Sequence, residues 1–169
     1  MGKKLTIGLI IIVIGLFALG RWSGGGSPQT ATLSNLNNNL APDFSLLKLD
    51  GSTISLSEFK GKKPVILDFF ATWCPNCRRD MPKLSSYYEK YKDQVEVIGI
   101  NLQENNKTVE NFITSRRISF PIALDPFSKV NRIYGIRYTN THILINKEGE
   151  IVRVIPGDIK ESDIQSLIQ

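Results

Sequence analysis

The two cysteines of this 169-residue chain, Cys74 and Cys77, lie in a Cys-Pro-Asn-Cys sequence and are its only thiols. The apolar run before them, residues 64–71, is typical of a buried β-strand. The residues after them predict a helix, because apolar side chains recur at helical spacing at Met81, Leu84, Tyr88 and Tyr91. Cys74 should therefore stand at a helix N-terminus, where free amide groups and the helix dipole favour a thiolate. Cys77 is one turn further on and can close a short disulfide, so the motif predicts reversible dithiol–disulfide exchange.

Two other uses of the cysteines are weaker. A structural zinc site usually needs four nitrogen or sulfur ligands, and the chain offers two cysteines and one histidine, His142. A purely structural disulfide would close so short a loop that it removes little entropy from the unfolded state. We therefore expect a redox-active Cys74–Cys77 disulfide, with no metal and no cofactor.

The two sulfurs are expected to have different roles. Cys74 is the candidate nucleophile, partly exposed at the helix start, with Arg78 and Arg79 nearby to favour its anion. Cys77 is the candidate resolving thiol. It is expected to be less exposed and to attack the mixed disulfide that Cys74 forms with a partner.

The other residues of the motif are candidates for partner binding. Trp73 can shield the disulfide and offer an apolar contact surface, or it can simply pack in the core. Pro75 suits the first turn of a helix, where its missing N–H costs nothing. Asn76 is expected to tune the stability of the thiolate.

Two carboxylates lie where they could exchange protons with the sulfurs. Asp68 interrupts the apolar strand, and a buried acid there is either functional or hydrogen-bonded for structure. A perturbed acid beside a nucleophile is a typical proton acceptor. Asp80 lies one turn after Cys77 on the same helical face, but it could equally be a solvated acid favoured by the helix dipole. His142 begins a later strand and is expected at the surface or in packing.

The N-terminus carries a separate apolar segment, residues 1–22. Lys3 and Lys4 precede an uncharged run, residues 5–20, and Arg21 and Trp22 follow it. As a helix this run would span roughly 24 Å, somewhat less than the hydrocarbon core of a bilayer. A membrane anchor with a cytoplasmic N-terminus is therefore expected. A cleaved secretory signal remains the alternative, and either outcome exports the rest of the chain.

The net charge of +5 arises mainly from this terminus. Lys3, Lys4 and Arg21 are three of the 21 basic residues, so 18 remain against 16 acidic ones in residues 22–169. No long basic run occurs there, which gives nucleic-acid binding no support. Residues 23–40 are small and polar, and we expect them to form a flexible linker.

The remaining residues, 41–169, read as one globular domain. Hairpins are predicted at residues 43–55, around an Asp-Gly turn, and at residues 141–155. Between them, predicted strands (65–70, 95–100, 120–124) alternate with predicted helices (75 to about 92, 108–116, 128–134). A last helix contains Ile164 and Leu167 and can be capped by Asp158 or Ser162. This order predicts an α/β fold with a mixed central sheet and helices on both faces.

The chain resembles the membrane-anchored TlpA/ResA-type thiol–disulfide oxidoreductases, which have the thioredoxin fold. The stretches that carry the resemblance are Ala41–Leu46, Leu56–Gly61, Asp68–Cys77, Phe120–Asp125, Tyr134–Arg137 and Leu144–Gly149. Residues 101–118 look like the strand–helix insertion that separates this group from minimal thioredoxins. The resemblance implies that Asp68 is the buried acid that assists Cys77, and that Asp80 matches an acidic position of the group.

One departure from the group concerns partner docking. Related proteins have a cis-proline in the loop that faces the active site, and here the aligned residue is Asn140, next to Thr139. A cis bond before a residue other than proline is costly, so a trans peptide or a strained loop is expected. Thr139 and Asn140 are nonetheless the candidates for contact with a partner's backbone.

These features predict an exported thiol–disulfide oxidoreductase, a monomer that reduces disulfides in other exported proteins. By resemblance, its substrates include the haem sites of apocytochromes c, and its electrons come from a membrane thiol carrier. One alternative is a peroxiredoxin-like peroxidase, although that chemistry needs a threonine where this chain has Ala71. Another is a non-catalytic adaptor, against which the retention of both cysteines argues.

Overall fold

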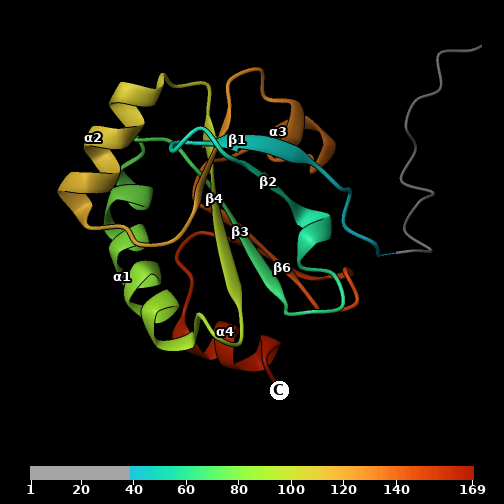
Figure 1. The fold of residues 1–169 in the computed structure, drawn as a ribbon. Coiled ribbons are helices and arrows are strands. Elements are labelled where there is room, and N and C mark those ends of the chain that lie inside the picture. The colour runs from blue at the N-terminus through green and yellow to red at the C-terminus, as the bar shows by residue number, and fades with distance from the viewer. Residues whose placement is uncertain (1–38) are drawn as a thin grey trace, which may run out of the picture. The chain divides into compact units, whose positions relative to one another are not determined.

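The computed structural model describes residues 39–169, which form a seven-stranded sheet with helices on both faces (Figure 1). The strand order is β2-β1-β5-β4-β3-β6-β7. The strands are β1 (Ser45–Lys48), β2 (Thr53–Ser55), β3 (Val65–Phe70), β4 (Glu96–Leu102), β5 (Ile122–Asp125), β6 (Thr141–Ile145) and β7 (Ile151–Pro156). The helices are α1 (Pro75–Tyr91), α2 (Asn106–Arg116), α3 (Lys129–Ile133) and α4 (Glu161–Leu167), with a short 3-10 helix η2 (Leu56–Glu58).

The sheet is mixed. Strand β4 runs parallel to both of its neighbours, β3 and β5, whereas β6 is antiparallel to β3 and to β7. All six residues of β3 are buried, because helices cover both of its faces. The predicted α/β thioredoxin fold is confirmed.

Alternation along β3 divides the core into two layers. Ile66 and Phe70 pack with side chains from α1, α2 and α4, while Leu67 and Phe69 pack with side chains from η2 and α3. Figure 1 shows α1 and α2 on one side of the sheet and α3 on the other. Asp68 lies between Ile66 and Phe70 on the strand, so its side chain points to the layer beneath α1.

Most predicted elements occur close to their expected positions, and β3 has the predicted bounds. Within the predicted insertion, residues 101–118, the structure has the last residues of β4 followed by α2. The expected cap of the last helix was wrong. The N-cap residue of α4 is Lys160, and the carboxylate of Asp163 accepts its backbone N–H, whereas Asp158 binds Arg79 instead.

The predicted anchor or signal segment, residues 1–22, and most of the predicted linker lie outside the described residues. At residue 39 the described chain already contacts the sheet, since the Asn39 carbonyl accepts the N–H of Ile151 and Leu40 pairs with Glu150. In the described part of the chain, every helix is too short or too polar to cross a bilayer.

Candidate active site

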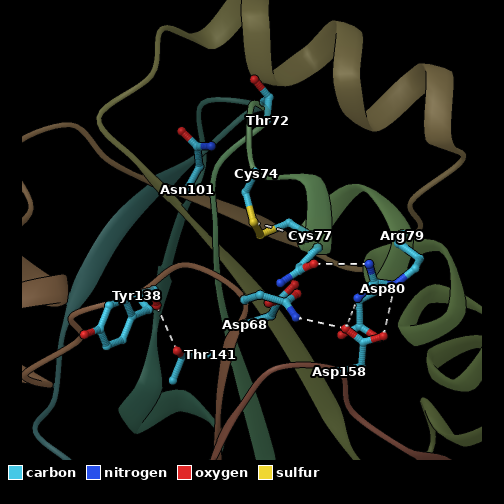
Figure 2. The surroundings of a disulfide bond; sticks show 12 residues. Asp68, Thr72, Cys74, Cys77, Arg79, Asp80, Asn101, Tyr138, Thr141 and Asp158 are labelled. Carbon is cyan, nitrogen blue, oxygen red and sulfur yellow. Dashed lines mark hydrogen bonds and ion pairs between the residues drawn. A yellow bond between two sulfur atoms is a disulfide. The ribbon is translucent and has the colours of Figure 1, made fainter.

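The cysteine motif forms the start of α1. Cys74 is the N-cap residue and Pro75 occupies the first turn, where a missing N–H is tolerated. The Sγ of Cys74 accepts the backbone N–H of Cys77 at 3.2 Å, and the two sulfurs form a disulfide (Figure 2). The predicted placement of the first sulfur at a helix N-terminus is therefore what the structure shows.

The two sulfurs differ in their surroundings more than in their exposure. Cys77 is fully buried, and Cys74 is only 4% exposed, less than the sequence suggested. Cys74, however, lines an open hollow of about 490 Å³, and Cys77 does not. A partner that enters this hollow would reach Cys74 first.

The hollow is built from the motif and from the loop that precedes β6. Trp73 and Tyr138 are 68% and 75% exposed, so Trp73 contributes a surface instead of packing in the core. Of the candidate partner-binding residues, four line the hollow: Trp73, Pro75, Asn76 and Thr139. The hydroxyl of Thr141 donates to the Tyr138 carbonyl and helps to hold this loop (Figure 2).

Asn140 lies behind the hollow and is 1% exposed. Its N–H donates to the Phe69 carbonyl at 2.8 Å, its own carbonyl accepts the N–H of Gly157, and its amide donates to Asp158. Its φ of +60° is left-handed, a region that asparagine tolerates better than most residues. Residues 39–169 contain no cis peptide bond, so this loop is built around a trans bond.

Arg79 connects the motif to the loop after β7. Its guanidinium donates to both carboxylate oxygens of Asp158, at 2.7 and 3.2 Å, and to the side-chain oxygen of Asn76 at 3.1 Å. The positive charge near the helix start, expected to favour the Cys74 anion, is therefore partly neutralised by Asp158. Asn76 orients Arg79, a contact that the sequence did not reveal.

Glu104 holds the loop that leads into the motif. Its carboxylate accepts the Thr72 backbone N–H at 2.7 Å and the Asn101 amide at 2.8 Å. Because Thr72 immediately precedes Trp73, this contact fixes the entry to α1. Glu104 follows β4 and was not singled out from the sequence, since nothing local links it to Thr72.

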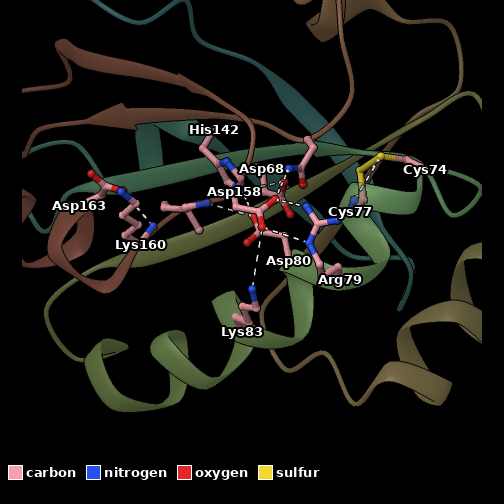
Figure 3. Close-up of polar contacts among 12 residues, drawn as sticks. Asp68, Cys74, Cys77, Arg79, Asp80, Lys83, His142, Asp158, Lys160 and Asp163 are labelled. Carbon is pink, nitrogen blue, oxygen red and sulfur yellow. Dashed lines mark hydrogen bonds and ion pairs between the residues drawn. A yellow bond between two sulfur atoms is a disulfide. The ribbon is translucent and has the colours of Figure 1, made fainter.

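Asp68 and Asp80 come together beneath α1, and His142 lies between them (Figure 3). In the antiparallel pairing of β3 with β6, His142 stands directly opposite Asp68. The Nε2 of His142 lies 3.3 Å from a carboxylate oxygen of Asp68 and 3.3 Å from one of Asp80. Asp80 also accepts the backbone N–H of Ile159 at 3.2 Å. All three side chains are at most 1% exposed, so Asp80 is not a solvated acid.

Burial perturbs the protonation of this group. Desolvation, and then the charge of Asp80, raise the pKa of Asp68 to about 8. Desolvation also raises the pKa of Asp80 to about 6, although its hydrogen bond with Ile159 opposes this. Burial lowers the pKa of His142 to about 4. Ionisable groups that titrate near neutral pH beside a disulfide are suited to proton transfer.

His142 was expected at the surface or in packing, and the structure buries it fully beside the carboxylates of Asp68 and Asp80. Its alternation with Leu144 places it on the face covered by α1. That alternation was readable in the sequence, whereas the register that sets it opposite Asp68 was not.

Comparison with known proteins agrees with this geometry. The AhpC/TSA family model matches residues 38–154. The chain is 42% identical over 130 residues to the thiol-disulfide oxidoreductase ResA of Halalkalibacterium halodurans, which covers 76% of this chain and 73% of the relative. The ResA of Geobacillus thermodenitrificans is 32% identical over 170 residues, 99% of this chain and 95% of the relative.

A solved structure supports the same conclusion. A thiol:disulfide interchange protein of the thioredoxin family from Chlorobium tepidum superposes with a TM-score of 0.68 at 28% identity, and the match covers 78% of this chain and 94% of that one. The fold, the disulfide at the start of α1 and these relatives agree. The chain belongs to the AhpC/TSA family and is a thiol–disulfide oxidoreductase of the ResA type, with Cys74 and Cys77 as its redox-active pair.

Proposed function

We propose that the chain is an exported reductase that transfers electrons from a membrane thiol carrier to disulfides of other exported proteins. The observation that carries the proposal is the pair of sulfurs at the start of α1, of which Cys74 alone lines an open hollow. Its ResA relatives support the same activity. By the same likeness, we propose that its substrates include the paired cysteines to which haem is attached in c-type cytochromes.

In the proposed reaction, the thiolate of Cys74 attacks a partner disulfide, and one partner sulfur leaves as a thiolate with the electron pair. Cys77 then loses its proton and attacks Cys74. The bond between Cys74 and the partner breaks, the second partner thiolate leaves, and the Cys74–Cys77 disulfide forms. Two electrons have then passed to the partner, and the thiol carrier must supply two to restore the dithiol.

The surrounding residues are assigned roles on their positions. Asp68 is proposed as the acceptor of the Cys77 proton, since its side chain occupies the core layer that contains Cys77. Asp80 is proposed as a second acid beneath the same helix turn. Trp73, Pro75, Asn76 and Thr139 are proposed to contact the partner. Asn140 is proposed to act indirectly, by holding the backbone of Thr139.

The two sulfurs can be tested separately in the full-length chain. Cys74→Ser should abolish reduction of a protein disulfide by dithiothreitol, because no other sulfur lines the hollow. Cys77→Ser should retain the attack but accumulate mixed disulfides through Cys74, detectable by mass spectrometry. If the wild type reduces the protein disulfide no faster than dithiothreitol alone, the proposal that the chain is a reductase is rejected. A measured reduction potential of the Cys74–Cys77 pair would then show whether the chain is an oxidant of partner thiols instead.

We also propose that residues 1–22 anchor the chain in the membrane, with the domain on the extracytoplasmic side. The support is the basic pair before the apolar run and the likeness to a ResA along almost the whole chain. The full-length protein should sediment with membranes, and its domain should be cleaved by protease added outside the cell membrane. A mature N-terminus near Arg21 would show instead that the segment is a cleaved signal.

A further inference from the structure

His142, the single histidine of the chain, has no role in the reaction as proposed so far. The Nε2 of His142 is equally distant, at 3.3 Å, from oxygens of Asp68 and Asp80. Figure 3 shows the two carboxylates pointing toward the imidazole beneath the start of α1. Within residues 39–169, neither oxygen of Asp68 and neither ring nitrogen of His142 has a hydrogen-bond partner, so the 3.3 Å contacts are the nearest polar approaches between these groups.

We propose that His142 joins Asp68 and Asp80 into one buried proton-accepting unit, in which its Nε2 passes a proton from Asp68 to Asp80 when Cys77 is deprotonated. His142 is thus a positioning residue that acts through Asp68 and touches neither the substrate nor the sulfurs. The inference rests on the proposed role of Asp68 as acceptor of the Cys77 proton.

Charge explains why a base between the acids is useful. Two ionised carboxylates in contact inside a protein repel each other and lose their hydration, so one of them retains a proton. The raised pKa values of about 8 for Asp68 and about 6 for Asp80 place that proton on Asp68 at neutral pH. If it moves to Nε2, an imidazolium lies between two carboxylates and the net charge of the unit is still −1. The proton can therefore move without adding charge to the core.

The step also explains why the relay is needed. A protonated Asp68 cannot accept a proton from Cys77, although it lies in the same core layer. When Asp68 gives its proton to Nε2, and Nε2 gives it to Asp80, Asp68 becomes an ionised acceptor. Cys77 then transfers its proton to Asp68 and attacks Cys74, which expels the partner thiolate. The unit gains the one proton that Cys77 loses, and its net charge changes from −1 to zero.

Other charged groups face the unit and set the pH range in which it can transfer a proton. From α1, Arg79 and Lys83 lower the pKa of Asp80, while Asp158, in the loop after β7, raises it. Asp158 itself is paired with Arg79 at 2.7 Å and approaches Lys83 at 3.9 Å. Asp163 of α4 also favours the charged imidazole, but it is paired with Arg153 of β7 at 2.6 Å.

The relay can be tested in a single turnover of the full-length, reduced protein with an aromatic disulfide whose released thiolate is coloured. The first release reports the attack by Cys74 and the second reports the attack by Cys77. In His142→Gln, which cannot carry the proton, the second release should slow at least about tenfold at neutral pH, and its pH midpoint should rise by about one unit or more. The first release should change less than about twofold.

Two further variants make the result specific. Ser85→Ala also removes a buried polar group, in this case one of α1 that donates to the Arg117 carbonyl. Ser85 lies outside the unit, so this variant should leave the second release and its pH profile as in the wild type. Asp68→Asn should slow the second release. If Asp68→Asn slows it and His142→Gln does not, the relay is wrong while the proposed function stands. If Asp68→Asn has no effect, the proposed role of Asp68 fails first.

A measurement on the unmodified chain covers the case in which His142→Gln does not fold. Because the chain has one histidine, nitrogen-15 labelling of histidine gives the imidazole signals without assignment. The relay predicts that the Nε2 resonance shifts as the two carboxylates titrate and differs between the oxidised and reduced protein. A resonance that stays the same across the pH range in which Asp68 and Asp80 titrate, in both redox states, would overturn the proposal.

Discussion

Asp68 binds a proton far more tightly in the folded chain than an aspartate does in an unfolded one. Burial raises its pKa to about 8, against about 3.9 for an exposed aspartate. Between these values the folded state holds more protons than the unfolded state. Stability must therefore fall as pH rises through this window, the opposite of what an aspartate in a salt bridge contributes.

We predict that the free energy of unfolding falls by about 1.4 kcal/mol for each pH unit around neutral pH, because folding takes up about one proton. Urea unfolding at a series of pH values would measure the slope. Asp68→Asn should remove most of it and raise the stability at pH 8 by about 2 kcal/mol or more. Asp50→Asn is the control. The pKa of this exposed acid is lowered to about 2, so its titration changes the free energy of unfolding only at acidic pH. An equal slope in Asp68→Asn and wild type would contradict the prediction.

Asn140 illustrates how a single backbone conformation limits substitution. Its φ of +60° cannot be adopted by proline, whose ring holds φ near −65°. Its N–H also donates to the Phe69 carbonyl, a bond that proline cannot make. Proline at position 140 would therefore strain this loop.

Asn140→Pro is accordingly predicted to lower the free energy of unfolding by more than about 1 kcal/mol. Asn140→Gly is the matched control, because glycine adopts a positive φ and keeps the N–H. Thermal unfolding would show a clearly lower melting temperature for the proline variant than for the glycine variant. If the proline variant is as stable as wild type, the loop has rearranged, and its rate with protein disulfides would then report the effect on docking.

At the scale of elements, close packing around β4 leaves no room for a side chain at Gly99. Gly99 of β4 pairs with Asp68 on the side opposite His142. A Cβ at this glycine would lie 2.6 Å from the Ile122 side chain and 3.0 Å from that of Phe120. A methyl group therefore cannot be added here without displacing the strand or its neighbours.

Gly99→Ala is predicted to destabilise the domain by about 1–3 kcal/mol through overpacking. Ser162→Ala, at an exposed position of α4, provides a control that should remain within about 0.5 kcal/mol of wild type. Denaturant unfolding would compare the two. A neutral Gly99→Ala would mean that the side chains of Ile122 and Phe120 move aside to admit the methyl group.

The elements also show what the sequence could predict. The bounds of β3 follow from an apolar run that only Asp68 interrupts, and the start of α1 follows from the Cys-Pro-Asn-Cys motif. The pairing of Asp68 with His142 joins strands that are far apart in the chain, and no local pattern encodes their register. The contact of Glu104 with Thr72 and the replacement of the expected α4 caps by Asp163 are equally products of tertiary packing.

At the scale of the whole molecule, the disulfide lies between two different environments. On one side is the open hollow, with Trp73 and Tyr138 at its rim. On the other is the buried unit of Asp68, Asp80 and His142. Partner recognition and proton transfer are thereby separated, so substitutions in one region should leave the chemistry of the other largely unchanged.

Because of this separation, the rim of the hollow should affect large protein partners more than small disulfides. Exposed aromatic side chains bury a large apolar area when a protein docks on them. The double variant of Trp73→Ala and Tyr138→Ala should therefore reduce a protein disulfide about tenfold more slowly, an effect of about 1.4 kcal/mol. A small aromatic disulfide, which contacts less of the rim, should react within about threefold of the wild-type rate. The control is Phe127→Ala, because this side chain is 80% exposed but lies outside the hollow. Equal losses with both substrates would show that the rim shapes the reactivity of Cys74 itself, and equal losses in the control would show that surface apolarity in general is what partners recognise.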